Sequence, residues 1–264
     1  MTILSRLRVF RGVRANMAYE FLGRRFKDET DWRFMNYGYA FKDESLNPRL
    51  DAVDEPERYS AHLYHVVASQ VKLTGAKLLD VGSGRGGGTS FVHRYFQPDM
   101  TTGMDRAESA VAFCKNVYNG LETLNFMPGD AMKMPFEDGA YDAVLNVESS
   151  HCYPDRTGFF KEVFRVLKPG GSFLYTDFFA RGERAGEDLK AVGFESVRTT
   201  DITDDVVRGL DRDHARRSGE IRSRFPFGLR RIAEFWAGTR GSPIYRDFSD
   251  GSREYHLYLA VKGG

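Results

Sequence analysis

Residues 77–91 read KLLDVGSGRGGGTSF, a stretch in which an apolar run is followed by a glycine-rich turn and the start of a helix. Glycine adopts positive φ angles without strain and lets the backbone approach a ligand closely. We therefore expect a buried strand over 77–81, a ligand-binding turn directly after it, and then a helix.

The chain on both sides of this stretch alternates apolar runs with helical patterns. Helices are expected over 57–72, 107–118 and 157–168. Further strands are expected over 101–104, 125–128, 141–147, 172–176 and 196–200, and the alternating run YHLYLAVKG at 255–263 predicts a last strand. This order is typical of βαβ units with right-handed crossovers, so it predicts an α/β fold with a mostly parallel sheet.

Two segments depart from the alternating pattern, and we expect both to cover the binding site. Residues 1–56 are basic and aromatic and form a predicted N-terminal helical lid segment. Residues 57–264 form the main domain, into which a helical cap is inserted at 203–253. The insert holds eleven Arg and no Lys, and it carries a helical stripe of Leu229, Ile232, Phe235 and Trp236.

The first 25 residues hold six Arg and a single acid, Glu20. They lack the apolar core and small-residue cleavage site of a signal peptide. A basic, partly amphipathic lid helix is the expected structure, and a helix lying on a membrane surface is the alternative.

The composition is ordinary for a globular protein, with 41% apolar and 28% charged residues among 264. A formal net charge of +1 creates no global field that would attract nucleic acid. The chain has two cysteines, no apolar run of membrane-spanning length, and no His/Cys/Asp cluster with metal-ligand spacing. We therefore expect a cytoplasmic protein without a metal or an integral membrane segment; a homo-oligomer and weak contact with a membrane surface are further expectations.

The glycine turn alone allows two classes of cofactor. Gly82, Gly84 and Gly87 satisfy the pattern G-x-G-x-x-G of dinucleotide-binding proteins. Asp105, 18 residues beyond Gly87, could bind the ribose of a nicotinamide cofactor. A nicotinamide-linked oxidoreductase is therefore an alternative on this motif.

Three further signals favour another cofactor. Asp80 stands directly before the turn, and an acid there suits a cofactor with a cationic amino group and opposes a pyrophosphate. Asp130, in MPGDAMKMPFEDGAYDAVLN (127–146), follows the third strand, where a carboxylate can accept a hydrogen bond from an adenine amine. Finally, EVFRVLKPGGSFLYTDF (162–178) predicts a helix ended by Pro-Gly-Gly and followed by a buried strand.

In this order and spacing, the segments resemble the motifs of class I S-adenosylmethionine-dependent methyltransferases. The resemblance implies a Rossmann-like fold with a seven-stranded, mostly parallel sheet and an antiparallel last strand. It also implies S-adenosyl-L-methionine as cofactor and S-adenosyl-L-homocysteine as product. The glycine loop would cradle the methionine part, Asp105 would bind both ribose hydroxyls, and Asp130 with Ala131 would meet the adenine. The expected cofactor-binding residues are Asp80, Gly82, Ser83, Gly84, Gly86, Asp105, Arg106, Asp130, Ala131 and Asn146.

A closer resemblance extends over nearly the whole chain. The segments DEPERYSAHLYHVVASQV (54–71), GRGGGTSF (84–91), VLNVESSHCYP (144–154) and SREYHLYLAVK (252–262) are similar to the phthiotriol/phenolphthiotriol dimycocerosates methyltransferases. That family O-methylates a secondary alcohol on a long lipid. The first 50 residues and the insert diverge most, and they would shape the acceptor pocket.

The loop after the fourth strand, NVESSHCYP at 146–154, lies at the carboxyl end of the predicted sheet, where open α/β sheets bind ligands. An alcohol acceptor must lose its proton near the transition state of methyl transfer. His151 is the candidate general base; the alternative is a histidine that only holds the loop. Glu148 could orient the His151 ring or hold the loop, and Cys152 is expected to pack.

Other candidate residues carry weaker functional predictions. His65 is expected to be solvated or to contact the lid, and Tyr37 and Tyr39 could wall the acceptor pocket or pack in the core.

The main prediction is an O-methyltransferase acting on a hydroxyl of an apolar lipid, polyketide or other secondary metabolite. C-methylation of a prenyl or sterol-like alkene, with aromatic faces stabilising a cation, is the alternative; N-methylation and a non-catalytic cofactor-binding partner follow.

Overall fold

The computed structural model describes residues 29–264, except the side chains of Ile232, Phe235 and Trp236. The basic helix expected in the first 25 residues, and most of the apolar stripe expected in the insert, therefore lie outside the described residues.

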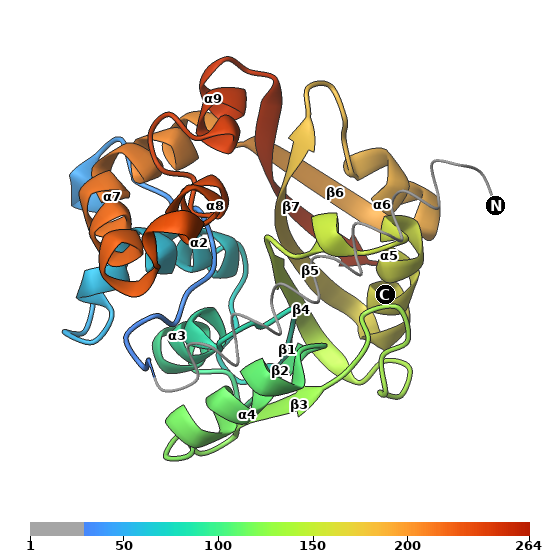
Figure 1. Ribbon diagram of the computed structural model, residues 1–264. Coiled ribbons are helices and arrows are strands. Elements are labelled where there is room, and N and C mark those ends of the chain that lie inside the picture. The colour runs from blue at the N-terminus through green and yellow to red at the C-terminus, as the bar shows by residue number, and fades with distance from the viewer. Residues whose placement is uncertain (1–28) are drawn as a thin grey trace.

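Within residues 29–264, seven strands form one sheet in the order β3-β2-β1-β4-β5-β7-β6 (Figure 1). Neighbouring strands from β3 to β5 pair in parallel, and β7 runs antiparallel between β5 and β6. This confirms the expected α/β fold with an antiparallel last strand. The strands are β1 (Lys77–Val81), β2 (Met100–Asp105), β3 (Leu124–Pro128), β4 (Tyr141–Val147), β5 (Leu167–Ala180), β6 (Phe194–Asp201) and β7 (Arg253–Lys262).

Helices cover both faces of the sheet, as Figure 1 shows. The longer ones are α2 (Arg58–Ala68), α3 (Gly87–Phe96), α4 (Glu108–Val117), α5 (Arg156–Val166), α6 (Gly186–Val192), α7 (Thr203–Arg224), α8 (Arg230–Trp236) and α9 (Pro243–Ser249). Short 3-10 helices are η1 (Glu44–Leu46), η2 (Glu55–Glu57), η3 (Ser150–Cys152) and η4 (Phe227–Leu229). The helices α7, α8 and α9 occupy the insert expected at 203–253.

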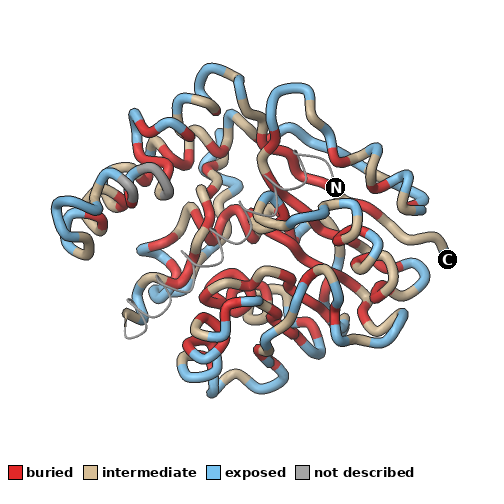
Figure 2. Tube along the Cα trace, turned by 45° about the vertical axis from the view of Figure 1, so that its right-hand side comes forward, coloured by how far each residue is buried: buried red, intermediate tan, exposed pale blue. Residues whose placement is uncertain are grey.

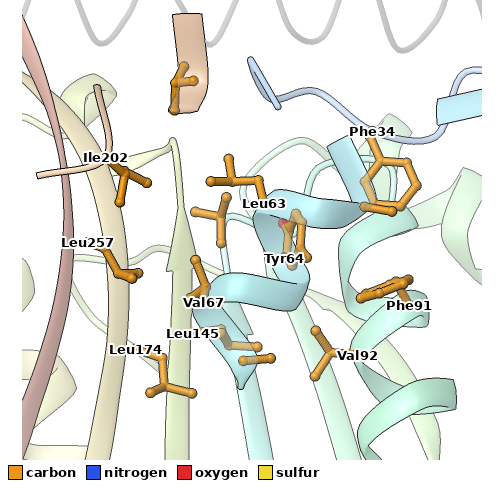
Figure 3. Packing of buried hydrophobic residues seen from close by; sticks show 14 of the residues in the cluster. Phe34, Leu63, Tyr64, Val67, Phe91, Val92, Leu145, Leu174, Ile202 and Leu257 are labelled. Carbon is orange, nitrogen blue, oxygen red and sulfur yellow. The ribbon is translucent and has the colours of Figure 1, made fainter. Parts of the chain in front are cut away.

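The two largest hydrophobic cores among the described residues lie on opposite faces of the sheet, because successive side chains of a strand point to opposite faces. Leu78 belongs to the core beneath α2, α3, α7 and α9, whereas its neighbour Leu79 belongs to the core beneath α5 and α6. Figure 3 shows Leu63 and Val67 of α2 pointing toward the side chains of the sheet. The central strands are buried and the exposed residues lie toward the outside of the molecule (Figure 2).

The strand β5 is longer than the expected 172–176. Leu167 already pairs with Tyr141, and the next pair joins Ser172 to Ala143, so residues 168–171 form an irregular bulge in the strand. The helix expected over 157–168 accordingly ends at Val166. Lys168 precedes Pro169, and a residue before proline prefers an extended backbone. The end of the helix at Val166, two residues before Lys168, agrees with this preference.

Residues 29–43 run without regular helix or strand from the glycine turn toward the insert. Backbone hydrogen bonds join Tyr39 N–H to the carbonyl of Tyr59 on α2 at 2.8 Å, and Ala40 N–H to the carbonyl of Asp205 on α7 at 3.0 Å. None of the helices within residues 29–264 combines the length and the apolarity that crossing a bilayer requires.

Candidate active site

A pocket opens at the carboxyl ends of β1, β2 and β4, where the strand order reverses between β1 and β4. It holds about 1280 Å³, part of which is open to solvent. Ligands of open α/β sheets bind at this switch point. The lining comes mainly from six segments of the chain: 32–36, 81–85, 104–107, 129–132, 147–149 and 152–154.

The glycines of the turn serve different purposes. A Cβ atom built on Gly82 would come 2.1 Å from the Ser149 Oγ, and one on Gly86 would come 2.8 Å from the Cys114 Sγ. Both glycines are therefore required by close packing of the protein. A Cβ on Gly84, whose φ is +52°, would have the Met35 Sδ at 3.6 Å as its nearest neighbour. Gly84 thus presents bare backbone to the pocket.

Asp80 lies beneath the turn and is fully buried. Its Oδ2 accepts a hydrogen bond from the Thr89 hydroxyl on α3 at 2.6 Å, whereas its Oδ1 has no hydrogen-bond partner among the described residues. Burial raises the pKa of the Asp80 carboxyl to about 7. The side chain supports the turn from below and does not belong to the residues that line the pocket.

The ends of β2 and β3 bring two more predicted acids to the pocket. Asp105 accepts hydrogen bonds from the backbone N–H of Gly84 and of Ala107, both at 2.8 Å, so it fixes the shape of the glycine turn. Asp130 is exposed at the pocket rim, and its Oδ1 accepts the N–H of Met132 at 2.9 Å. The neighbours Arg106 and Ala131 also line the pocket.

Ser83 and Asn146 occupy buried positions near the glycine turn. The Ser83 Oγ is buried without a hydrogen-bond partner among the described residues, and the residue lines the pocket. The Asn146 Nδ2 donates to the Val81 carbonyl and to the Ser149 Oγ, both at 2.8 Å, behind the pocket wall. Asn146 therefore holds the wall, while Ser83 keeps a polar atom available at the site.

Glu148 is the predicted residue with the most unusual surroundings. It follows β4 with a φ of +48°, a left-handed conformation that residues other than glycine rarely adopt and that is found at functional sites. Its Oε1 accepts hydrogen bonds from the Tyr37 N–H at 2.7 Å and from the Tyr255 hydroxyl at 2.6 Å. Burial raises the pKa of the Glu148 carboxyl to about 7. The residue lines the pocket and joins the N-terminal segment to β7 through these bonds.

His151 pairs with a carboxylate that the sequence did not single out. Its Nδ1 lies 2.9 Å from the Asp177 Oδ1, and its backbone N–H donates to the Asp177 Oδ2, also at 2.9 Å. Asp177, fully buried in β5 three residues before the strand ends, also accepts a hydrogen bond from the Ser150 hydroxyl at 2.6 Å. Asp177, and not Glu148, therefore orients the His151 ring.

The His151–Asp177 pair favours the protonated form of the imidazole. Burial by itself lowers the pKa of the His151 imidazole, but the Asp177 charge and its hydrogen bond outweigh this and raise that pKa well above its usual range. The ring packs on Phe178 with 4.4 Å between centroids, and 26% of the side chain is exposed. The pocket lining includes the neighbours Ser149 and Cys152 but not His151 itself.

The remaining candidates, His65 and Tyr39, pack among aromatic side chains. His65 on α2 packs against Phe41, Phe91 and Phe96, with 5.5 Å between its ring and that of Phe96. Tyr39 stacks edge-on with Phe41 at 4.9 Å. These contacts place His65 under the N-terminal segment, away from the lining of the pocket.

Comparison with known proteins identifies the family. A family model described as a methyltransferase domain matches residues 79–175. The chain is 38% identical over 251 residues to a fatty-acid O-methyltransferase of Mycolicibacterium smegmatis, an alignment that covers 93% of this chain and 89% of that protein.

This chain belongs to the S-adenosylmethionine-dependent methyltransferases.

Two further similarities agree with the family. The methyltransferase is 36% identical to the phthiotriol/phenolphthiotriol dimycocerosates methyltransferase of Mycobacterium tuberculosis, with 87% of this chain and 85% of that protein covered. Its fold matches the crystal structure of the [4+2]-cyclase SpnF with a TM-score of 0.69 at 23% identity, covering 94% of this chain and 95% of that one. At that identity the second likeness concerns the fold alone.

The pocket of the methyltransferase fits its cofactor, S-adenosyl-L-methionine. Gly84 leaves room for a ligand where a side chain would intrude, and the Ser83 Oγ offers a buried polar atom without a partner among the described residues. The carboxyl groups of Asp105 and Glu148 lie in the lining of the same pocket, where they can accept hydrogen bonds from the ligand.

Three residues at or beside this site were not predicted from the sequence: Asp177, Tyr255 and Arg217. Asp177 stands in the apolar run FLYTDFF, and an acid inside a buried strand was the available signal. Tyr255 belongs to an alternating strand pattern that gives no reason to single out one tyrosine. Arg217 is one of eleven arginines of the insert, and only the fold shows that it donates to the carbonyls of Asn36 and Tyr37 at 3.0 and 3.1 Å.

Proposed function

We propose that this methyltransferase transfers a methyl group from S-adenosyl-L-methionine to a hydroxyl oxygen of an apolar small molecule, such as a lipid, a polyketide or another secondary metabolite. The observation that carries the proposal is the His151–Asp177 pair, a proton-accepting group set among aromatic rings beside the cofactor pocket. The two named relatives support it, because one is a fatty-acid O-methyltransferase and the other acts on phthiotriol-type lipids by name.

The surroundings of His151 suit an apolar acceptor. Phe178, on which the ring packs, also contacts Tyr37 at 5.7 Å and Phe248 at 5.8 Å between ring centroids. These rings come from the N-terminal segment, β5 and α9, and they pack into one aromatic cluster beside His151 that we assign as a wall of the acceptor site. An aromatic wall of this kind binds a hydrocarbon chain through burial of apolar surface.

The cofactor would be held by residues that line the pocket. We assign the methionine part to the turn at Gly82, Ser83 and Gly84, the ribose to Asp105 with Arg106, and the adenine to Asp130 with Ala131. An indirect role is assigned to Asp80, Gly86 and Asn146, which would support the glycine turn and the pocket wall without contacting the cofactor. When bound, the cofactor supplies an activated methyl group on a sulfonium centre.

The proton of the acceptor hydroxyl is assigned to His151. Because the ionised Asp177 accepts from Nδ1, the imidazole Nε2 is the atom left to take a proton. The neutral ring does this work, and the raised pKa of His151 shifts the formation of that form to higher pH. Glu148 is given a positioning role, since it fixes Tyr37 and Tyr255 beside the acceptor.

Two acceptors of equal chain length, a secondary alcohol and a fatty acid, test the assignment. With the alcohol, His151→Ala should lower kcat by roughly 10²–10⁴ while the affinity for S-adenosyl-L-homocysteine stays unchanged. The wild-type rate should rise with pH through an inflection above the ordinary histidine pKa of about 6.5, and the variant should lose it. The fatty acid is already ionised, so its rate should lack this inflection.

Three outcomes would contradict the proposal. If His151→Ala keeps the wild-type kcat on the alcohol, the histidine only holds its loop. If product analysis finds the methyl group on carbon of a prenyl-type alkene and never on oxygen, C-methylation is the activity. If only the fatty acid is methylated, the acceptor oxygen belongs to a carboxylate and not to a hydroxyl.

A further inference from the structure

The connection between α7 and α8 carries an exposed apolar tip. Residues 222–231, here called the 222–231 tip, read RSRFPFGLRR. Phe227 is 86% exposed and Leu229 is 43% exposed, and both lie in the short helix η4. The side chain of Phe227 contributes little to the core, and together with Leu229 it forms an exposed apolar spot at this turn that is open to a partner outside the fold.

The charge of the 222–231 tip is entirely positive. Arginine is its only charged residue type, and it holds no acid. The side chains of Arg222 and Arg231 are exposed and have no carboxylate partner among residues 29–264. Arg230 donates to the carbonyls of Phe225 at 3.1 Å and Arg222 at 2.8 Å, which holds the turn in shape without neutralising it.

The tip lies close to the mouth of the cofactor pocket. Arg224 forms ion pairs with Glu29 and Asp31, and the next residue, Trp32, lines the pocket. The 28 residues that precede Glu29 in the sequence include the six arginines and few acids of the N-terminal segment. They join the described chain at the residue that Arg224 contacts.

We infer that the 222–231 tip docks this methyltransferase onto the surface of an anionic lipid bilayer. Phe227 and Leu229 would enter the boundary between headgroups and acyl chains, and Arg222 and Arg231 would meet lipid phosphates. Apolar side chains flanked by arginines bind such surfaces because burial and electrostatic attraction add. A nucleic acid would pair with the arginines and its bases could stack on Phe227, but it would leave Leu229 without an apolar medium. The lipid surface, which accommodates all of these side chains, is the occupant that the chemistry favours.

This inference is independent of which atom the enzyme methylates. It gives the enzyme a place to meet acceptors that are too apolar to dissolve, because Arg224 of the tip pairs with Asp31, the neighbour in sequence of the pocket-lining Trp32. The surface area is small, so the contact is reversible and depends on salt.

Flotation of the full-length protein with vesicles tests the docking. The vesicles contain phosphatidylcholine alone or with phosphatidylglycerol. Wild type should float with the anionic vesicles and much less with the neutral ones. Arg222→Gln with Arg231→Gln should weaken partitioning about fivefold per arginine, and Phe227→Ser with Leu229→Ser should remove the part of the binding that persists at high salt. All four side chains are exposed, so the fold should be unaffected.

Matched controls change the same residue types elsewhere on the surface. Arg49→Gln with Arg181→Gln, and Leu46→Ser with Val53→Ser, should bind vesicles as wild type does, since these exposed residues lie outside the tip. In a Phe227→Trp variant, lipids brominated near the headgroup should quench the added fluorescence, which reports insertion directly.

Three results would overturn the inference. The first is a wild-type protein that fails to float with anionic vesicles. The second is flotation of both tip variants at the wild-type level, which would assign binding to another segment. The third is full competition by a soluble polyanion such as heparin while the Phe227 and Leu229 changes have no effect, which would indicate a polyanion surface. Turnover of a water-soluble acceptor without vesicles should be equal in all variants. This measurement distinguishes a variant that has lost catalytic activity from one that has lost only vesicle binding.

Discussion

Gly84 has open space in front of it, whereas its neighbours in the turn are packed against protein atoms. A Val side chain there would fill part of the pocket, so Gly84→Val should abolish binding of S-adenosyl-L-homocysteine and leave a folded protein. Gly182 provides a matched control, because it also has a positive φ, +79°, and an added Cβ there would meet no atom within 4 Å. Gly182→Val should carry a similar backbone strain and keep full affinity in calorimetry. Retained binding in the Gly84 variant would place the cofactor elsewhere.

Asp105 combines two tasks, since it shapes the turn and faces the pocket. We expect Asp105→Ala to weaken binding of S-adenosyl-L-homocysteine by about 1.5–3 kcal/mol, the usual worth of a hydrogen bond to a charged group. Asp130→Ala, at the exposed rim, should cost less. Calorimetry that finds unchanged affinity in a folded Asp105→Ala variant would remove the ribose assignment.

Glu148 gives the site a charge that depends on pH. Because the pKa of its carboxyl is raised to about 7, the negative charge in the pocket appears as pH rises through that value. The sulfonium of the cofactor is cationic and the homocysteine product lacks that charge. The affinity for S-adenosyl-L-methionine, divided by the affinity for S-adenosyl-L-homocysteine, should therefore rise from pH 6 to pH 8 in wild type. The same ratio should stay constant in Glu148→Gln. An equal slope in both proteins would show that another group carries the effect.

The role of a single residue could be predicted where the residue belongs to a recognisable sequence motif. It could not be predicted where the residue contacts its partner only through the fold. Gly84 and Asp105 lie where the glycine motif and the end of the second strand indicated. The orienting partner of His151 was not foreseen, since Asp177 is 26 residues away along the chain and meets it only because β4 and β5 pair in parallel.

Among the elements, the N-terminal segment is held from two sides. Glu148 accepts the Tyr37 N–H below it, and Arg217 of α7 donates to the carbonyls of Asn36 and Tyr37 above it. Arg217 is buried and also pairs with the buried Asp213 at 2.8 Å. Hydrogen bonds thus connect the N-terminal segment both to α7 and to the pocket wall. That the segment and the insert form a mobile cover over the acceptor stays a prediction.

Breaking this connection should loosen a whole element. Arg217→Ala leaves the carbonyls of Asn36, Tyr37 and Ala237 without this donor. The buried Asp213 keeps its ion pair with Arg216, so we expect a loss of about 1–3 kcal/mol in the free energy of unfolding. Hydrogen exchange should also accelerate over residues 33–40. Arg212→Ala, which removes only an exposed pair with Glu44, should cost under about 1 kcal/mol. Equal losses in the two variants, measured by urea unfolding, would show that Arg217 has no special part.

Strands and helices were predictable because periodicity records which face is buried, and their ends were less so. The expected 77–81 and 141–147 coincide with β1 and β4. The start of β5 was not foreseen, because the pairing of Leu167 with Tyr141 depends on the neighbouring strand and not on the local sequence.

At the scale of the whole molecule, two buried carboxyls make stability depend on pH. Burial raises the pKa of Asp80 and of Glu148 to about 7, above the values near 4 of unfolded chains. Between these values the unfolded state has released its protons while the folded state still holds them, so stability falls as pH rises from about 5 to 7. Urea unfolding at several pH values checks this, and Glu148→Gln should flatten the slope. A rising slope in wild type would contradict the assignment.

The global fold and the cofactor followed from the sequence, since the order of motifs fixes both. The acceptor did not, because the aromatic rings that we propose as its wall come from the N-terminal segment, β5 and α9, which lie far apart in sequence. The expected homo-oligomer and cytoplasmic location stay predictions.

The position of β7 between β5 and β6 has a consequence for how the chain is made. On the ribosome, β1 to β5 can assemble as they emerge, but β6 has no partner until residues 253–262 arrive three helices later. During that interval the outer edge of β5 and both edges of β6 are open to pairing with other chains. A pause in translation within the insert would lengthen this exposure, so synonymous codon choice over 203–253 should affect yield more than the same change over 1–56.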